Sequence, residues 1–241
     1  MRKSFLMSLG AAFGSSLGVA VGAAAGGGLP GLLLGAAGGA ALGAGIAWLL
    51  ASSPSRGPSP SLALVVIARD EEQGLPRTVA SVRDYVDEIV IAVDSRTTDR
   101  TREVVPGARV FEVEFKDFAQ MRTAAVREAK SDWVLMLDGD ETLEGDPRPL
   151  LRERVIWQMP RRHWADLDRR TPSAADRAYP DRQCRLFPND PSIRFERPVH
   201  ELTTGLKVKT APYPLIHHFK EALRPPEVIA DRARLYAELS G

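Results

Sequence analysis

The sequence predicts an α/β fold, a mainly parallel sheet flanked by helices, which follows an apolar helical hairpin rich in glycine. Two observations carry this prediction. Between residues 62 and 143, apolar segments of strand length alternate with helical segments, which is typical of a parallel sheet covered by helices. The first 51 residues are mostly apolar or glycine, and Arg2 and Lys3 are their only charged residues.

The composition divides the chain into three regions. Residues 1–51 are expected to be a membrane segment, residues 52–61 a linker rich in proline and serine, and residues 62–241 the folded domain. Glycine recurs every four residues from Gly10 to Gly26 and from Gly31 to Gly43, so that in two helices the glycines would share one face. Such a glycine zipper lets membrane helices pack closely. A single span, a disordered tail and a signal peptide are the alternatives.

The charge balance and the cysteine content limit the possible functions. The formal net charge is +1, without the basic excess of nucleic acid-binding proteins, and no nucleic acid partner is expected. Cys184 is the single cysteine, which excludes an intramolecular disulfide. In a membrane hairpin, Arg2, Lys3 and Arg56 would all lie on one side, and that side would be the cytoplasm.

The elements of the folded domain are predicted in chain order. The run LALVVIA is continuous, apolar and partly β-branched, as expected for a strand buried on both faces. Strands are predicted at residues 62–68, 88–93, 109–113 and 133–138, with helices at 76–85, 98–105 and 117–130. The second half is less regular, with strands at 155–159, 184–187, 193–195 and 206–209, a charged loop at 166–182 and a helix at 221–239.

Carboxylates gather where the fourth predicted strand ends. In DWVLMLDGDE, Asp138 closes the strand, and Asp140 and Glu141 follow it. Carboxylates this close repel one another unless a cation neutralises them. The polar loops RDEE and DSRTTD follow the first two strands, and ligands of such sheets bind beyond the carboxyl ends of the strands. The pattern predicts that Mg²⁺ or Mn²⁺ joins these acids to a diphosphate.

Three stretches together resemble a known family. VVIARDEE, IAVDSRTTDRT and FAQMRTAAVREAKSDWVLMLDGDE are similar in order and spacing to the inverting family 2 glycosyltransferases of the Rossmann-like GT-A fold. The later RLFPNDPSIRFERPVHE and PLIHHF resemble a bacterial branch that acts on lipopolysaccharide cores and surface glycans. The resemblance covers nearly all of the folded domain and none of residues 1–61.

The resemblance implies transfer of a sugar, with inversion, from a nucleotide-sugar donor to a glycan, lipid-linked or protein acceptor. UDP-sugar is the default donor of the family. Residues 62–143 would bind the nucleotide and residues 144–241 the acceptor. The catalytic domain would be membrane-associated and would face the cytoplasm, where nucleotide sugars are made.

The resemblance also implies roles for residues at the strand ends. Asp94 would accept hydrogen bonds from the base, and Asp70 and Arg122 would face the nucleotide-sugar. Asp138 would contact the ribose or the metal, and Asp140 would be the main metal ligand.

This sequence departs from the family pattern in the first two loops. The family usually has Asn at the position of Asp70, and small residues at the positions of Arg96 and Arg100. These departures leave the donor base open. Arg96 and Arg100 are interpreted as solvated loop charges.

Acidic and histidine residues of the second half supply the remaining candidates. An inverting transfer needs a base that takes the proton of the acceptor hydroxyl, and Glu201 in RPVHE is the candidate. The neighbouring His200 is either a third metal ligand or a structural residue of the loop. Of His217 and His218, we prefer His218 as the group near the diphosphate and a possible metal ligand.

Two alternatives come from other functional classes. VLMLDGDETL also fits the first motif of haloacid dehalogenase-like phosphatases, with Asp138 as the phosphorylated nucleophile and Asp140 as the acid/base. Three strand-like segments before the motif, and the lack of a later acidic pair after Leu143, argue against it. The other alternative is a catalytically degenerate domain on a membrane scaffold.

Overall fold

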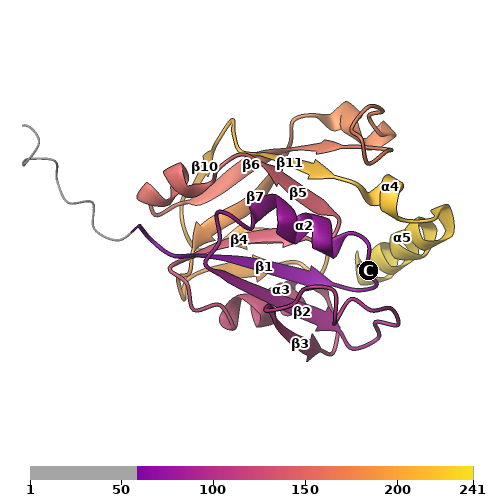
Figure 1. Ribbon diagram of the computed structural model, residues 1–241, viewed down its shortest axis with the longest axis horizontal. Helices are drawn as coiled ribbons and strands as arrows, with labels where there is room; N and C mark the ends of the chain where they lie inside the picture. Colours follow the sequence, from indigo (N-terminus) through magenta and orange to yellow (C-terminus); the bar gives the residue numbers. More distant parts are fainter. Residues whose placement is uncertain (1–58, 241) are drawn as a thin grey trace, which may run out of the picture. The chain divides into compact units, whose positions relative to one another are not determined.

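A nine-stranded mixed sheet organises residues 59–240, the part of the chain that the structure, a computed structural model, describes (Figure 1). Its strand order is β3-β2-β1-β4-β7-β6-β11-β5, and β10 pairs with β6. The hairpin predicted for residues 1–51 lies outside the described residues, as does most of the linker. Among residues 59–240, no helix has both the length and the apolar character that crossing a bilayer requires.

The four strands predicted in the first half are confirmed. They are β1 (Leu62–Ala68), β2 (Glu88–Asp94), β3 (Arg109–Val113) and β4 (Trp133–Asp138), all parallel. β1 lies between β2 and β4 and is buried along its whole length, as its continuous apolar run requires.

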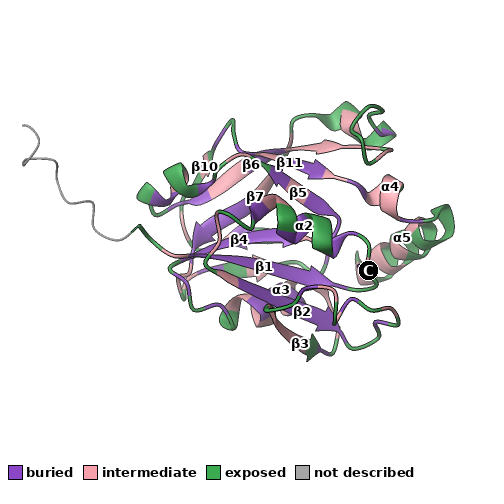
Figure 2. Ribbon diagram, in the orientation of Figure 1, coloured by how far each residue is buried: buried purple, intermediate pink, exposed green. Residues whose placement is uncertain are grey.

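Helices cover both faces of this parallel part. Alternate β1 residues face opposite layers, so that Leu64 joins the core cluster of α2 (Leu75–Val82) and Val65 joins that of α3 (Phe118–Arg127). α3 begins after Asp117, whose carboxylate accepts a hydrogen bond from the backbone N–H of Gln120 at 2.7 Å. Figure 2 shows the central strands as the most buried elements.

The helix predicted for residues 98–105 is wrong, since these residues form turns. In these turns, side-chain oxygens accept from the backbone N–H groups, in place of the carbonyl oxygens that would accept in a helix. Asp99 accepts from the N–H groups of Glu72 and Thr101, and Asp70 accepts from that of Thr98. Short acidic side chains compete with helix formation in this way.

The second half adds short strands that are mostly antiparallel to their neighbours. Its elements are β5 (Glu141–Glu144), η1 (Arg148–Arg152), β6 (Ile156–His163), η2 (Ala174–Ala178), β7 (Asp181–Pro188), β8 (Arg194–Glu196), β9 (Leu202–Thr204), β10 (Val208–Thr210) and β11 (Leu215–His218). β7 runs antiparallel to β4 and makes the sheet mixed. β5, β9 and β11 are not among the predicted strands, because three or four residues carry too little periodicity to be recognised.

The chain returns to the carboxyl edge of the sheet at its C-terminal end. After β11, the backbone N–H of Phe219 donates to the carbonyl oxygen of Asp140 at 2.9 Å. α4 (Lys220–Leu223) and α5 (Pro226–Ser240) then lie on the side toward which the arrowheads of β1 and β2 point (Figure 1). The predicted terminal helix is therefore confirmed for most of its length, although Arg224 and Pro225 separate it into two.

Candidate active site

The carboxyl ends of three strands bring the predicted acids to one edge of the sheet. Asp138 is the partner of Ile67 in the β1–β4 register, and Val93 is the partner of Ala68 in the β1–β2 register. The loops that carry Asp70, Asp94 and Asp140 therefore start from the same edge, as the polar strand ends predict.

Asp138 is held between two arginines. The Arg122 Nη2 donates to its Oδ1 at 2.8 Å, and the Arg185 Nη2 donates to its Oδ2 at 2.5 Å. Burial opposes ionisation of Asp138, but Arg122 and then Arg185 outweigh it and hold the pKa below the usual value of 3.8. Asp138 is therefore a carboxylate whose charge is already compensated.

Arg185, on β7, is a site residue that the sequence analysis missed. Its side chain is 6% exposed and also donates to Glu141 at 2.9 Å, while Arg161 of β6 donates to the same carboxylate at 2.7 Å. An arginine just before the buried pair Leu186 and Phe187 is the signal that could have found it, because a buried guanidinium needs carboxylate partners.

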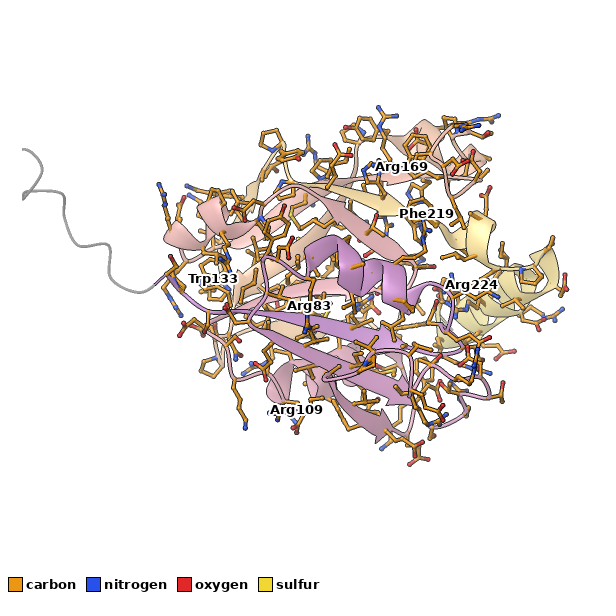
Figure 3. All side chains as sticks on the ribbon, in the orientation of Figure 1. Arg83, Arg109, Trp133, Arg169, Phe219 and Arg224 are labelled. Atoms are coloured by element: carbon orange, nitrogen blue, oxygen red, sulfur yellow. The ribbon has the colours of Figure 1, made fainter. Side chains whose placement is uncertain are left out.

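Asp140 is held by the C-terminal end of the chain. Arg224, between α4 and α5, donates to Asp140 through Nη1 and to Glu71 through Nη2. Burial opposes ionisation of Asp140, but His218 and Arg224 lower its pKa well below 3.8. Burial, followed by the charge of Asp140, raises the pKa of Glu71 to about 7. Figure 3 shows Arg224 at the edge where α4 and α5 meet the sheet, far from Trp133 at the start of β4.

Glycine at position 139 allows the acids to approach each other. A Cβ at Gly139 would lie 2.8 Å from the Glu71 Cγ, and a Cβ at Gly74 would lie 2.3 Å from the Gly139 carbonyl oxygen. The DGD turn therefore packs directly on the loop after β1, which is why Arg224 reaches Glu71 and Asp140 together.

His218 and His217 point to different surroundings. The His218 Nε2 lies 3.3 Å from the Asp140 Oδ2, and its Nδ1 lies 2.9 Å from the Nδ1 of His163, which in turn contacts Asp181 at 2.9 Å. His217 instead accepts from the Trp164 indole at 2.9 Å. Of the two histidines, His218 is the one beside Asp140, and its expected place near the diphosphate and its role as a metal ligand stay predictions.

Asp94 and Asp70 stand at the ends of β2 and β1. Asp94 is 1% exposed and accepts from Arg96 at both oxygens, with Nη2 2.6 Å from Oδ2. The Arg96 guanidinium also lies 4.7 Å above the Phe115 ring, although the Arg96 side chain remains 46% exposed, as expected for a solvated loop charge. Asp70 has a φ of 52°, which Asn and Asp tolerate better than most residues do. An Asp can therefore stand at the position where the family that this sequence resembles usually has Asn.

Glu201 pairs with an arginine of the site, and His200 contacts Tyr236 of α5. The Glu201 Oε1 lies 3.5 Å from the Arg122 Nε, so Arg122 links it to Asp138, and its side chain is 13% exposed. His200 has a φ of 52° and is exposed, and its ring centroid lies 6.0 Å from that of Tyr236 on α5. Of these two residues, Glu201 is the one with an ion pair to a site arginine, and the role of His200 as a metal ligand stays a prediction.

The carboxylates at this edge supply the oxygen atoms that a hard divalent cation prefers. They are not arranged so that several of them could bind one ion. Asp138 has both oxygens bonded to arginines, and the Asp140 Oδ2 contacts Arg224 and His218. Among residues 59–240, no three His, Cys, Asp or Glu side chains are placed to hold one metal ion. Guanidinium groups hold the ligand oxygens that a cation would need.

The arginines at this edge keep unsatisfied N–H groups. Within the described residues, the Nη1 of Arg122 and the Nε of Arg185 and of Arg224 are buried and have no hydrogen-bond partner. Buried donors in native proteins are almost always paired, so these groups call for an additional acceptor. A phosphate group offers such acceptors and carries the matching charge.

The residues of the site that come from the first half of the chain fall within a known family match. Residues 63–153 match the family described as Glycosyl transferase family 2. A TPR repeat-containing protein of Synechococcus elongatus is 34% identical over 172 residues, which are 66% of this chain and 42% of that protein. An uncharacterized glycosyltransferase of Rickettsia bellii is 30% identical over 84 residues, 34% of this chain and 28% of that protein. The chain spans less than half the length of these curated relatives.

Solved structures with similarity to this chain include two proteins in complex with UDP. S. aureus TarS in complex with UDP has a TM-score of 0.46 and 13% identity, covering 73% of this chain and 64% of that chain. Glucosyl-3-phosphoglycerate synthase of Mycobacterium tuberculosis, in complex with Mn²⁺, UDP and phosphoglyceric acid, has a TM-score of 0.35 and 21% identity, covering 43% of each chain.

Proposed function

We propose that this chain, which carries a glycosyl transferase family 2 domain over residues 63–153, transfers a sugar from a nucleotide-sugar donor to an acceptor hydroxyl. The observation that supports the proposal best is the meeting of strand-end acids and buried arginines at the carboxyl edge of this domain. The phosphatase alternative has no such support, because the stretch on which it rests lies inside the family match.

The donor would lie across the ends of β2, β1 and β4. Asp94 and the Arg96 that it fixes face the nucleotide base, and Asp70 begins the loop beside it. A UDP-sugar is the default donor of the family. Arg96 is one of the residues here that depart from the family pattern, and it contacts Asp94, so we expect it to influence the choice of base.

The diphosphate would lie over the arginines. Arg122, Arg185 and Arg224 each keep a buried N–H without a partner among the described residues, and phosphate oxygens would accept from those groups. As the bond between the sugar and the diphosphate breaks, negative charge grows on the departing oxygen. Fixed positive groups in a site with little water stabilise that charge.

Glu201 would act as the base of an inverting displacement. Its carboxylate takes the proton of the acceptor hydroxyl, the hydroxyl oxygen bonds to the anomeric carbon, and the bond to the diphosphate breaks on the opposite face. The products are the glycosylated acceptor and a nucleoside diphosphate. Arg122, whose Nε lies 3.5 Å from the Glu201 Oε1, would position this carboxylate.

Mn²⁺ or Mg²⁺ is expected to bind together with the nucleotide-sugar donor. Asp138 and Asp140 provide the hard oxygen ligands that these ions prefer. In the arrangement described, guanidinium groups hold those oxygens, and no step of the transfer is assigned to a metal.

A donor panel tests the proposal. The full-length chain is incubated with UDP-, GDP-, CMP- and dTDP-sugars, with Mn²⁺ or Mg²⁺, and release of the free nucleotide is measured. We expect release from at least one donor, and a loss of about 100-fold or more in Glu201→Gln when an acceptor is supplied. Absence of nucleotide binding and of release with every donor would favour the degenerate domain, and release of phosphate from p-nitrophenyl phosphate would favour the phosphatase.

We also propose that residues 1–51 attach the enzyme to a membrane with the catalytic domain on the cytoplasmic side, where glycan or lipid-linked acceptors are within reach. The glycine-zipper pattern supports this proposal. Flotation of the full-length chain with liposomes, compared with a chain that starts at residue 59, measures it. Equal flotation of both would contradict it.

A further inference from the structure

Arginine side chains take up the carboxylate oxygens at the carboxyl edge of the sheet. Asp138 is bonded to Arg122 at one oxygen and to Arg185 at the other. Asp140 accepts from Arg224. In the part of the chain that the structure describes, no group of three His, Cys, Asp or Glu side chains is placed to share an ion. The chain therefore supplies its own positive charge at the place where the acidic stretch predicts a bound cation.

Burial and ion pairs hold these guanidinium groups in position. Arg122 on α3, Arg185 on β7 and Arg224 after α4 are all buried. Burial opposes the charge of Arg185, but Asp138 and Glu141 outweigh burial and raise its pKa above the usual value. Charged groups that are fixed before a ligand binds need little rearrangement to stabilise an anion. The edge is therefore prepared for negative charge before any donor arrives.

Each of the three arginines keeps a donor for a further acceptor. Within residues 59–240, the Nη1 of Arg122 and the Nε of Arg185 and of Arg224 have no hydrogen-bond partner. The Asp138 side chain, which lies between two of these arginines, is 26% exposed, so the edge is open to solvent at this point. Guanidinium groups match phosphate oxygens in charge and in the spacing of their donors. A diphosphate that enters beside Asp138 therefore meets a guanidinium on both sides.

We propose that the guanidinium groups of Arg122, Arg185 and Arg224 take over the charge compensation of a divalent cation, so that a nucleoside diphosphate binds here with an affinity that does not depend on Mn²⁺ or Mg²⁺. The inference rests on the proposed function, since it concerns the diphosphate of the same donor. An ion that arrives with the donor is then held by the phosphates and adds little to the affinity. The arginines stay paired with the acids, and the C-terminal segment that carries Arg224 stays at the edge.

Calorimetric titration of the full-length wild type with UDP tests the proposal without any reaction. One titration contains an excess of EDTA and the other an excess of Mn²⁺. We expect the two Kd values for UDP to agree within about threefold. In EDTA, UMP should bind about tenfold or more weakly than UDP, because it lacks the second phosphate that the arginines would hold. A larger rise of the Kd for UDP in EDTA, or equal affinities for UMP and UDP there, would overturn the proposal.

A variant assigns the affinity to a guanidinium group. Arg224→Gln should weaken UDP binding in EDTA by about tenfold, because a hydrogen bond to a charged group is lost. Arg224→Lys keeps the charge and should lose less. Arg234→Gln is the matched control, because Arg234 lies on α5 with a side chain that is 74% exposed, and its Kd should equal that of the wild type. Unchanged UDP affinity in a folded Arg224→Gln protein would overturn the role of Arg224.

The two proposals fail in different ways. If UDP binds and sugar is transferred only when Mn²⁺ or Mg²⁺ is present, the charge compensation by arginines fails and the proposed function stands. If none of UDP, GDP, CDP and dTDP binds to the wild type, with or without the ion, the proposed function fails together with this inference.

Discussion

Arg185 offers the sharpest test of how the site is held together. The Arg185→Leu substitution keeps the volume but removes the charge that joins Asp138 and Glu141 from β7. Breaking a buried ion pair by removing one partner costs about 3–5 kcal/mol. Asp138 keeps Arg122 and Glu141 keeps Arg161, so we expect the lower end, about 3 kcal/mol, which for a domain of this size lowers Tm by about 6–12 °C.

The loss should also depend on pH in a defined direction. Two arginines depress the pKa of Asp138 in the folded protein, so its contribution to stability is present above 3.8, the unfolded value, and fades as the pH falls below it. Without Arg185 this contribution shrinks, and the difference between variant and wild type should be larger at pH 7 than near pH 3.

Urea unfolding followed by tryptophan fluorescence measures this prediction. Trp133 is 2% exposed at the start of β4 and reports on the central sheet. Arg234→Leu is the control, and we expect it to change the free energy of unfolding by less than about 0.5 kcal/mol. If Arg185→Leu is as stable as this control at pH 7, the ion pairs between β7 and β4 do not hold the site.

Three further predictions concern the neighbouring residues. Gly74→Ala places a Cβ against the Gly139 carbonyl and should lower the free energy of unfolding by about 1–3 kcal/mol; an unchanged urea midpoint would show that the two loops are not in contact. A hydrogen bond from His163 and the charge of Arg161 outweigh burial and depress the pKa of Asp181, so Asp181→Asn should cost about 1 kcal/mol at pH 7, and the difference should shrink progressively as the pH falls below 3.8. If the free energies of unfolding of Asp181→Asn and of the wild type fall in parallel as the pH is lowered, this assignment is contradicted. Glu201→Gln should leave the Kd for UDP within about twofold of the wild-type value and lower kcat by about 100-fold or more. If the affinity for UDP falls by the same factor as kcat, Glu201 has a role in donor binding instead.

The parallel half of the fold could be predicted from the sequence because its signals are local. The run LALVVIA has the continuous apolar character of a strand buried on both faces, and its observed bounds equal the predicted ones. The turns at residues 98–105 could not be predicted, because the side chain of Asp70, distant in sequence, takes up the Thr98 N–H there.

The acids of the site could be predicted and their partners could not. Asp94, Asp138 and Asp140 stand at strand ends, which the alternation of elements reveals directly. Arg185 and Arg224 reach the acids from β7 and from the C-terminal segment, and no short-range pattern connects positions 47 and 84 residues apart. The arginines that neutralise the acids therefore appear only once the chain is folded.

One surface hollow of this domain lies away from the acids. A hollow of about 400 Å³ is found near the amino-terminal ends of β2 and β3, with Arg83, Asp87 and Arg109 among its lining residues (Figure 3). At the carboxyl edge, Arg122, Arg185 and Arg224 are buried among the acids. Ligands of parallel sheets bind at the carboxyl edge, so we place the donor there and treat the hollow as the competing location.

Photolabelling with 5-azido-UDP separates these two locations and tests the central claim, that the carboxyl edge binds the nucleotide of an activated sugar. The full-length chain is irradiated with the probe, with and without excess UDP, and the labelled peptides are sequenced. The account predicts labelling within residues 69–74, 94–101 or 115–122 that excess UDP prevents. Label confined to residues 83–89 and 107–109, or label that UDP does not reduce, would contradict it.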